Sequence, residues 1–153
     1  MATASGRLVA AGLSLALAAG LAWSTASRGA KTPTRSAYLA QARSICQEFS
    51  KDLDHIPPIQ DPTLLGEVLE SANAALPLLR EQSYRIHELT PPRALRPQVD
   101  RFFVLTDRSI DTLASVRDAA VKMDTGNVGV GLIRFARETE AAKQVGRRIG
   151  YRC

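Results

Sequence analysis

Residues 95–123 read LRPQVDRFFVLTDRSIDTLASVRDAAVKM, and this stretch decides the fold. Its apolar side chains recur in steps of three and four, which is the spacing of one face of an α-helix. Pro97 predicts a short first turn before the main helix, and Asp124-Thr125-Gly126-Asn127 ends it with residues typical of turns. The inward positions are Leu95, Val99, Phe102, Phe103, Thr106, Ile110, Leu113, Val116 and Ala120.

Two segments before this stretch have the same periodicity. Residues 35–56 are expected to form a helix that Pro57-Pro58 stops, because proline cannot donate a backbone hydrogen bond. The next helix opens at Asp61 and Pro62, an N-cap followed by proline at the first helical position. Pro77 lies inside it, but the apolar positions keep their phase, so we expect one bent helix. The inward positions are Tyr38, Leu39, Ala42, Ile45, Cys46, Phe49, Leu53 and Ile56 in the first helix, and Leu65, Val68, Leu69, Ala72, Leu76, Leu79, Ile86 and Leu89 in the second.

A last helix is expected over residues 128–149, where Gly146 and Gly150 weaken its end, as glycines do at helix C-termini. Amphipathic helices of similar length with short connections pack most simply as an up-down-up-down four-helix bundle. The sequence therefore predicts an all-α fold. The inward positions of the last helix are Val128, Leu132, Phe135, Ala136, Ala142, Val145 and Ile149.

The N-terminus has the pattern of an export signal. Arg7 is followed by an uninterrupted run of apolar and small residues at positions 8–23, and small residues at Ser24 and Ala26 would suit cleavage after Ala26. The run is close enough to the length of a bilayer span that an uncleaved anchor is the equal alternative, and a buried cytosolic helix is a third. The expected organisation is a leader over residues 1–26, a linker over 27–34 and the helical bundle over 35–153.

Export to an oxidising compartment favours a disulfide between Cys46 and Cys153, the two cysteines of the chain. In the expected topology the tail after Gly146 or Gly150 must fold back along the first helix to reach Cys46. The alternative is a buried Cys46 that packs as a small hydrophobic residue, with Cys153 unpaired.

The sequence contains little that suggests catalysis or a cofactor. His55 and His87 are expected on the surface at opposite ends of the bundle, so neither a haem nor a two-metal site is expected. Nucleophile motifs and glycine-rich phosphate loops are missing as well. We therefore expect no enzyme, metal or cofactor. A row of carboxylates on the third helix alternates with arginines and is expected to be a solvated surface: Asp100, Asp107, Asp111 and Asp118.

The chain carries 20 Lys+Arg against 15 Asp+Glu, a formal net charge of +5, and its 45% hydrophobic content argues against disorder. The positive excess is concentrated in residues 134–153 and would suit anionic lipid headgroups or wall polymers. A solvated basic face is the simpler interpretation. Most aromatic residues fall on inward positions, so no nucleic-acid partner is expected.

Several short motifs together resemble small exported or membrane-anchored helical proteins of high-GC bacteria, most of which have no assigned function. The resemblance covers residues 35–153 and implies an extracytoplasmic bundle closed by Cys46 and Cys153, without implying an activity. The lipid-attachment cysteine that many such leaders carry is missing here. The motifs are Ile45-Cys46, Leu89-Thr90-Pro91-Pro92, the Asp-rich third helix, the turn after Met123-Asp124, and Ile149-Gly150-Tyr151-Arg152-Cys153.

The sequence thus predicts a non-enzymatic, extracytoplasmic bundle with a binding or scaffolding role at the cell envelope, anchored by residues 8–23 or released after cleavage. The residues expected to matter are structural, with the cysteine pair as the staple, Pro62 and Pro92 as helix starters and Gly150 as a terminal hinge. The alternative is a carrier that holds a small apolar ligand or lipid between the helices, in a gap left by Ala72–Ala75 and Pro77.

Overall fold

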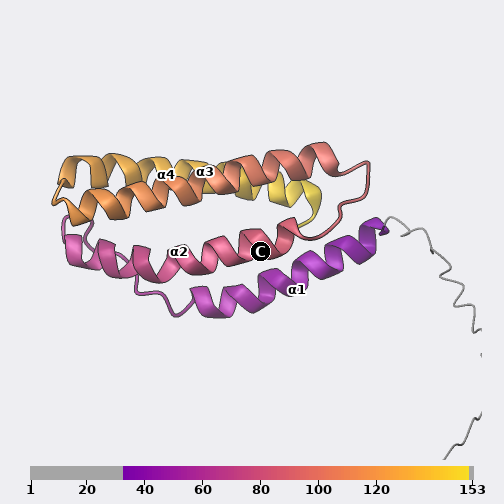
Figure 1. Cartoon of the computed structure of the whole chain (residues 1–153), viewed down its shortest axis with the longest axis horizontal. Coiled ribbons are helices and arrows are strands. Elements are labelled where there is room, and N and C mark those ends of the chain that lie inside the picture. Colours follow the sequence, from indigo (N-terminus) through magenta and orange to yellow (C-terminus); the bar gives the residue numbers. More distant parts are fainter. Residues whose placement is uncertain (1–32, 152–153) are drawn as a thin grey trace, which may run out of the picture. The chain divides into compact units, whose positions relative to one another are not determined.

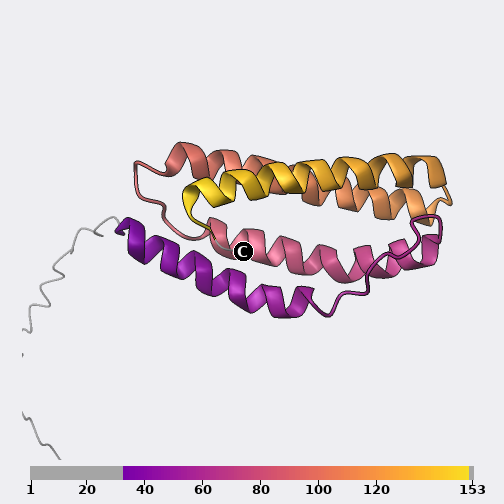
Figure 2. The ribbon, with the colours of Figure 1, turned by 180° about the vertical axis from the view of Figure 1, so that it is seen from behind.

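The computed structural model describes residues 33–151, and within them the fold is all-helical, with no strand. The helices are α1 (Arg35–Leu53), α2 (Leu65–His87), α3 (Arg96–Val121) and α4 (Thr125–Ile149). They pack as a bundle in which consecutive helices run in opposite directions (Figures 1 and 2). The leader expected over residues 1–26 and Cys153 lie outside the described residues. None of the described helices is long and apolar enough to cross a membrane.

The expected start of α2 at Asp61 and Pro62 is wrong, because hydrogen bonds between side chains and backbone hold this segment as a turn. The Asp61 carboxylate accepts hydrogen bonds from the Thr63 amide and hydroxyl at 2.9 and 2.7 Å. The Glu67 carboxylate reaches back from α2 to the amides of Gln60 and Asp61 at 2.9 and 3.1 Å. The helix therefore begins only at Leu65.

Pro92 does not start α3 either. The Leu95 amide donates to the Pro92 carbonyl at 2.9 Å, so Pro92 belongs to a turn, and α3 begins at Arg96 with Pro97 in its first helical turn. In contrast, the expectation that Pro77 lies inside one helix is confirmed, since α2 is continuous across it.

Both ends of α4 are determined by local backbone chemistry. The helix begins at Thr125, three residues before the expected start, because Asp124 caps it with a carboxylate that accepts a hydrogen bond from the Asn127 amide at 3.0 Å. Gly150 ends the helix in the left-handed conformation with φ 104°, as expected of a glycine at a helix C-terminus. The chain turns there, and Tyr151 is buried against the bundle. Ala136, expected to face inward, is exposed instead.

The buried apolar residues of the described part form three separate clusters along the bundle. The first, which we call the large cluster, lies where α1 and α4 meet the end of α2 and the start of α3. The central cluster joins the middles of α2 and α3, and the distal cluster lies at the opposite end. The large cluster contains Tyr38, Ala42, Ile45, Cys46, Phe49, Ile86, Leu95, Val99, Phe103, Val145, Ile149 and Tyr151; the central one Ala72, Leu76, Ile110 and Leu113; the distal one Val68, Val116, Ala120 and Val128.

Packing between the helices is uneven. α3 and α4 share the most extensive contact, α2 packs against α3 less closely, and α1 packs mainly against α2. Figure 2 shows α1 running beside the C-terminal half of α2, with the connection to Leu65 continuing in the same direction past the N-terminal half. This uneven packing leaves α1 and α4 without close backbone contact along most of their length.

Candidate functional site

A cavity of about 670 Å³ lies inside the bundle, between the large cluster and the central cluster. All of α1 to α4 contribute to its wall, which is mostly apolar. Its volume lies within the roughly 300–1,000 Å³ typical of small-molecule sites. The lining residues are Cys46, Ser50, Leu53, Leu79, Gln82, Ser83, Ile86, Phe102, Thr106, Ser109, Ile110, Phe135, Thr139, Ala142, Lys143, Gly146, Arg147 and Tyr151.

The hydroxyl groups in the α2 and α3 walls of the cavity are already satisfied by the protein. Thr106 donates to the Phe102 carbonyl at 3.0 Å, Ser109 to the Thr106 carbonyl at 2.8 Å, and Ser83 to the Asp107 carboxylate at 3.2 Å. Thr139 on α4 differs. Among the described residues its Oγ1 is the one buried side-chain polar atom without a hydrogen-bond partner.

The cavity opens between α1 and α4, because its exposed lining residues are Ser50 on α1 and Lys143 and Arg147 on α4. Arg147 pairs with the Glu140 carboxylate at 2.9 Å, and this hydrogen bond lowers the pKa of Glu140. Lys143 makes no ion pair with the described residues. The opening therefore carries a positive charge beside an apolar interior.

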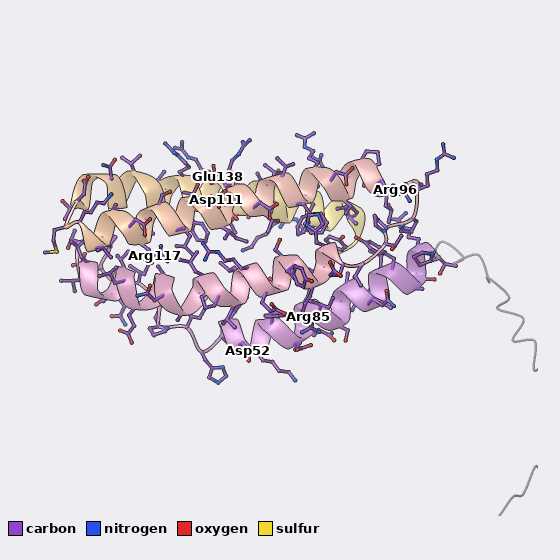
Figure 3. The ribbon with its side chains drawn as sticks, in the orientation of Figure 1. Asp52, Arg85, Arg96, Asp111, Arg117 and Glu138 are labelled. Carbon is purple, nitrogen blue, oxygen red and sulfur yellow. The ribbon has the colours of Figure 1, made fainter. Side chains whose placement is uncertain are left out.

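A bidentate ion pair holds α1 against α2 beside the cavity. Arg85 donates to both Glu48 carboxylate oxygens, at 2.6 and 3.0 Å, and its guanidinium lies 5.4 Å from the centre of the Phe49 ring. Figure 3 labels Arg85 where α2 faces α1. Because α1 is held on its α2 side, its other side remains free to border the opening.

Tyr151 lines the cavity just after α4 and forms a buried pair with Tyr38 of α1. The hydroxyl groups of Tyr38 and Tyr151 are hydrogen-bonded to each other, and the Tyr151 ring packs edge-on against Phe102. Burial raises the pKa of both phenols. Arg35 also donates to the Ile149 carbonyl at 3.2 Å, which ties the start of α1 to the end of α4.

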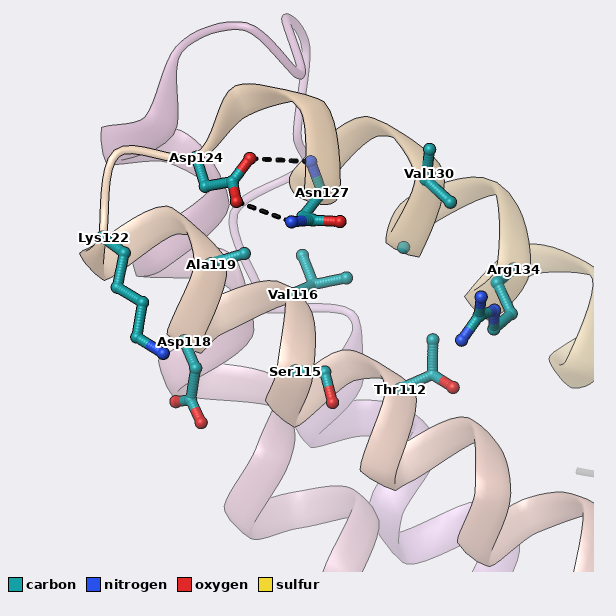
Figure 4. Close-up of a pocket in the computed structure, with 11 residues that line it drawn as sticks. Thr112, Ser115, Val116, Asp118, Ala119, Lys122, Asp124, Asn127, Val130 and Arg134 are labelled. Atoms are coloured by element: carbon teal, nitrogen blue, oxygen red, sulfur yellow. Dashed lines mark hydrogen bonds between the residues drawn. The ribbon is translucent and has the colours of Figure 1, made fainter.

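Two other hollows of the described bundle are smaller and more polar. One of about 390 Å³ lies between the end of α3 and the start of α4, where Asp124 is hydrogen-bonded to Asn127 (Figure 4). Another of about 440 Å³ lies between α2 and α3 and includes His87, Asp107 and Asp111. The large cavity has the greatest volume and the most apolar wall of the three, so it is the candidate site.

The residues singled out in the sequence are scattered over the bundle rather than gathered at the cavity. His55 and His87 are exposed, and the His87 ring stacks on Phe103 at 3.8 Å between centroids. No group of His, Cys, Asp or Glu in residues 33–151 is arranged to hold a metal ion. The row of carboxylates on α3 is exposed, and Asp118 pairs with Arg117 at 2.6 Å.

The gap expected beside Ala72–Ala75 is not where the cavity lies. Ala72 is buried in the central cluster, and the cavity begins one turn later on α2, at Leu79. Cys46 lines the cavity and is 1% exposed, whereas its expected partner Cys153 lies outside the described residues. Lys143 belongs to the basic stretch 134–153 singled out in the sequence, whereas nothing in the sequence pointed to Thr139, although it lies four residues before Lys143 on the same side of the helix.

Comparison with known proteins identifies no relative of this chain. No protein-family model matches the chain, and neither a curated protein nor a solved structure is similar to it.

Proposed function

We propose that this protein is a non-enzymatic carrier that holds a small apolar molecule between the helices of an extracytoplasmic, up-down-up-down bundle at the cell envelope. The observation that carries the proposal is the 670 Å³ cavity, whose mostly apolar wall comes from α1 to α4. Burying apolar ligand surface there would be favourable by about 25 cal/mol per Å². The lining contains no carboxylate and no histidine among the described residues, which favours binding over acid–base catalysis.

The test is saturable binding of the neutral fluorescent probe phenylnaphthylamine to the full-length chain. Ser50→Trp should weaken binding, because Ser50 is an exposed residue at the opening and the indole would obstruct it. Ser44→Trp is the matched control, since Ser44 is an exposed serine on the same helix that does not line the cavity. Filling the interior by Ala142→Phe should also abolish binding. Absence of saturable binding to the unmodified chain would refute the carrier function.

The proposed location depends on the leader and needs a separate measurement. An intact mass beginning at Ser27 supports a cleaved signal, and a full-length chain retained in carbonate-washed membranes supports an anchor over residues 8–23. A full-length chain in the soluble cytosolic fraction would contradict export in either form.

Contact with an envelope surface, as a scaffold, is the second candidate function. It is favoured by exposed large apolar residues around the turn between α3 and α4, where Val121 and Met123 are 66% and 74% exposed beside Lys122. Met123→Glu should then reduce co-sedimentation with vesicles of anionic phospholipid. Unchanged co-sedimentation would argue against this surface.

A further inference from the structure

The charge of the bundle is distributed unevenly, and its positive part lies on α4. Residues 33–124 carry eleven basic and thirteen acidic side chains, whereas α4 carries five basic and two acidic ones. Both acidic side chains of α4 are held within the bundle. Glu138 accepts a hydrogen bond from Thr112 at 2.6 Å, and Glu140 accepts one from Arg147 at 2.9 Å. The described part of the chain therefore combines one basic helix with three helices that are slightly acidic together.

The exposed side of α4 also carries two large apolar residues. Val130 and Ile133 are each 58% exposed. Positions that follow them in steps of three and four lie on the same side of the helix, and these include the exposed Arg137 and Arg148. Figure 2 shows α4 in front of α3, with no other element over it. We call this surface the α4 face, and its members are Val130, Ile133, Arg134, Arg137, Gln144 and Arg148.

The chemistry of the α4 face fits a surface of anionic lipid. Arginine guanidinium groups hydrogen-bond phosphate oxygens in a bidentate geometry, and each basic residue near an anionic membrane strengthens binding about fivefold. Val130 and Ile133 can be buried at the boundary between headgroups and acyl chains, as in amphipathic helices that lie in the plane of a membrane. A soluble polyanion would attract the arginines but leave both apolar side chains in water, so the combination favours lipid.

We infer that the α4 face docks onto a membrane surface containing anionic phospholipid, with α4 lying along that surface. Lys143 and Arg147, the exposed residues of α4 at the opening of the cavity, lie beside this face on the same helix. Docking therefore brings the opening close to the lipid, from which an apolar ligand enters the cavity with little exposure to water. This transfer of ligand rests on the proposed carrier function, whereas the docking itself does not.

The first experiment locates the contact by tryptophan fluorescence of the full-length chain. Trp23 is the only tryptophan, so Trp23→Phe combined with Ile133→Trp places a single indole on the α4 face. Its emission should shift to shorter wavelengths when vesicles of phosphatidylglycerol and phosphatidylcholine are added. Trp23→Phe combined with Tyr84→Trp is the matched control, because Tyr84 is 60% exposed on α2, and its emission should not shift. An unshifted indole at position 133 would overturn the docking.

The second experiment tests the arginines by comparing binding to phosphatidylglycerol-containing vesicles with binding to phosphatidylcholine alone. Combined Arg134→Gln, Arg137→Gln and Arg148→Gln should lower the preference for the anionic vesicles by about fivefold for each arginine removed. A matched control neutralises three exposed basic residues of α1 and α2 and should retain most of the preference. Every variant keeps residues 1–32, so their contribution is common to all. The control substitutions are Arg43→Gln, Lys51→Gln and Arg80→Gln.

The remaining outcomes each identify a different contact. Equal losses in the two triple variants mean that binding follows net charge, which contradicts a specific α4 face. A loss of the preference in Met123→Glu but not in the α4 triple variant assigns the lipid contact to the turn between α3 and α4 instead. If the indole at position 133 shifts without vesicles as the protein concentration rises, the α4 face binds a second copy of the chain and the lipid assignment fails.

Failure of the docking and failure of the carrier function are distinguishable, because phenylnaphthylamine binding is measured without lipid. A chain that binds the probe but does not prefer anionic vesicles retains the carrier function and loses the docking surface. A chain that docks through the α4 face but does not bind the probe retains the docking surface and loses the carrier function.

Discussion

Two residues of the bundle adopt a left-handed backbone at a helix end, and only one of them is glycine. Gly150 turns the chain after α4 with φ 104°, and Met123 does the same after α3 with φ 59°. After α3, the amides of Met123 and Asp124 donate back to the carbonyls of Ala120 and Ala119, which is a Schellman motif. The left-handed conformation is strained for methionine and unstrained for glycine.

Gly150→Ala should therefore lower the free energy of unfolding by about 1–2 kcal/mol, the cost of an L-residue in the left-handed region. The added methyl group would also lie 3.2 Å from Leu39 Cδ1, which tightens an already packed contact. Urea unfolding followed by circular dichroism measures the change. Met123→Gly is the reciprocal variant and should stabilise by up to about 1 kcal/mol. Equal stability of the Gly150→Ala and unmodified chains would contradict the strain argument.

At the scale of single residues, the sequence predicts those conformations that depend on residue type alone. Gly150 was expected to end a helix because glycine is the usual residue there, and the structure confirms it. The left-handed Met123 has no such signal. Nothing in the sequence indicates the unpartnered Thr139 hydroxyl either.

The contact between α3 and α4 is close because Gly131 has no side chain. A Cβ at position 131 would lie 2.5 Å from Val116 Cγ2, whereas a Cβ at Gly129 would meet nothing within 4 Å. Figure 4 shows Val116 directed from α3 toward α4. Valine is stiff about χ1, so Val116 cannot move aside without cost.

Gly131→Ala and Gly129→Ala should accordingly change stability in opposite directions. Alanine favours a helix interior by up to about 1 kcal/mol over glycine, so Gly129→Ala should stabilise the chain. At Gly131 the same gain is outweighed by overpacking against Val116, which costs about 1–3 kcal/mol. Chemical denaturation of both variants provides the comparison. Two stabilised variants would mean that α3 and α4 are not in close contact at Val116.

The contact between α1 and α2 should depend on pH through Glu48. The hydrogen bond from Arg85 lowers the pKa of this carboxyl in the folded state. Its stabilising contribution is therefore present above the unfolded-state pKa of about 4.3 and is lost as the pH falls through the lower folded-state pKa. Melting temperatures of the unmodified chain and Glu48→Gln should differ at neutral pH and converge below about pH 4.

Glu70→Gln is the control for this titration, because Glu70 is an exposed carboxylate on α2 without an ion pair to the described residues. Its melting curve should follow the unmodified chain across the same pH range. A gap between the unmodified chain and Glu48→Gln that persists at acid pH would indicate that the substitution acts through packing rather than through charge. Salt should narrow the gap at neutral pH, since the pair is exposed.

The helices themselves could be predicted from periodicity, but their ends could not. The 3.6-residue period identifies the inward face, and most of the expected inward positions are buried or half-buried. The starts of α2 and α4 depend instead on which carboxylate caps which amide. Asp61 binds Thr63 and stays in a turn, whereas Asp124 binds Asn127 and starts a helix. Ala136 was misplaced because alanine is tolerated on either face of a helix.

Across the whole bundle, the cavity depends on spacings between helices that the sequence pattern does not encode. Periodicity predicts which residues face inward, but not that the large and central clusters stay apart with a cavity between them. The small residues at Ala72–Ala75 led us to expect a gap there. In the structure they instead allow α2 to pack closely against α3 in the central cluster. The cavity lies instead where α1 packs mainly against α2 and has little backbone contact with α4.

The expected disulfide would affect the stability of the whole bundle, because it would connect the C-terminal tail to the middle of α1. Tyr151 is buried against Tyr38 two residues before Cys153, so the chain already returns toward α1 beyond Gly150. Cys46 lies two turns after Tyr38 on the same face of α1 and lines the cavity. Closing a loop of about 100 residues should stabilise the fold by roughly 4–5 kcal/mol in chain-entropy terms.

Cys153→Ser should therefore lower the free energy of unfolding by about 2–5 kcal/mol and leave the burial of Cys46 unchanged. Alkylation without reductant should add no mass to the unmodified chain from its native host, and reduction should then expose two thiols per chain. The loss of stability should vanish when both chains are compared in reductant, because the unmodified chain then lacks the bridge as well. Two thiols that react before reduction would disprove the staple. In that case the Tyr38–Tyr151 hydrogen bond and the packing of Tyr151 on Phe102 would hold the chain after α4 against the bundle without a covalent link.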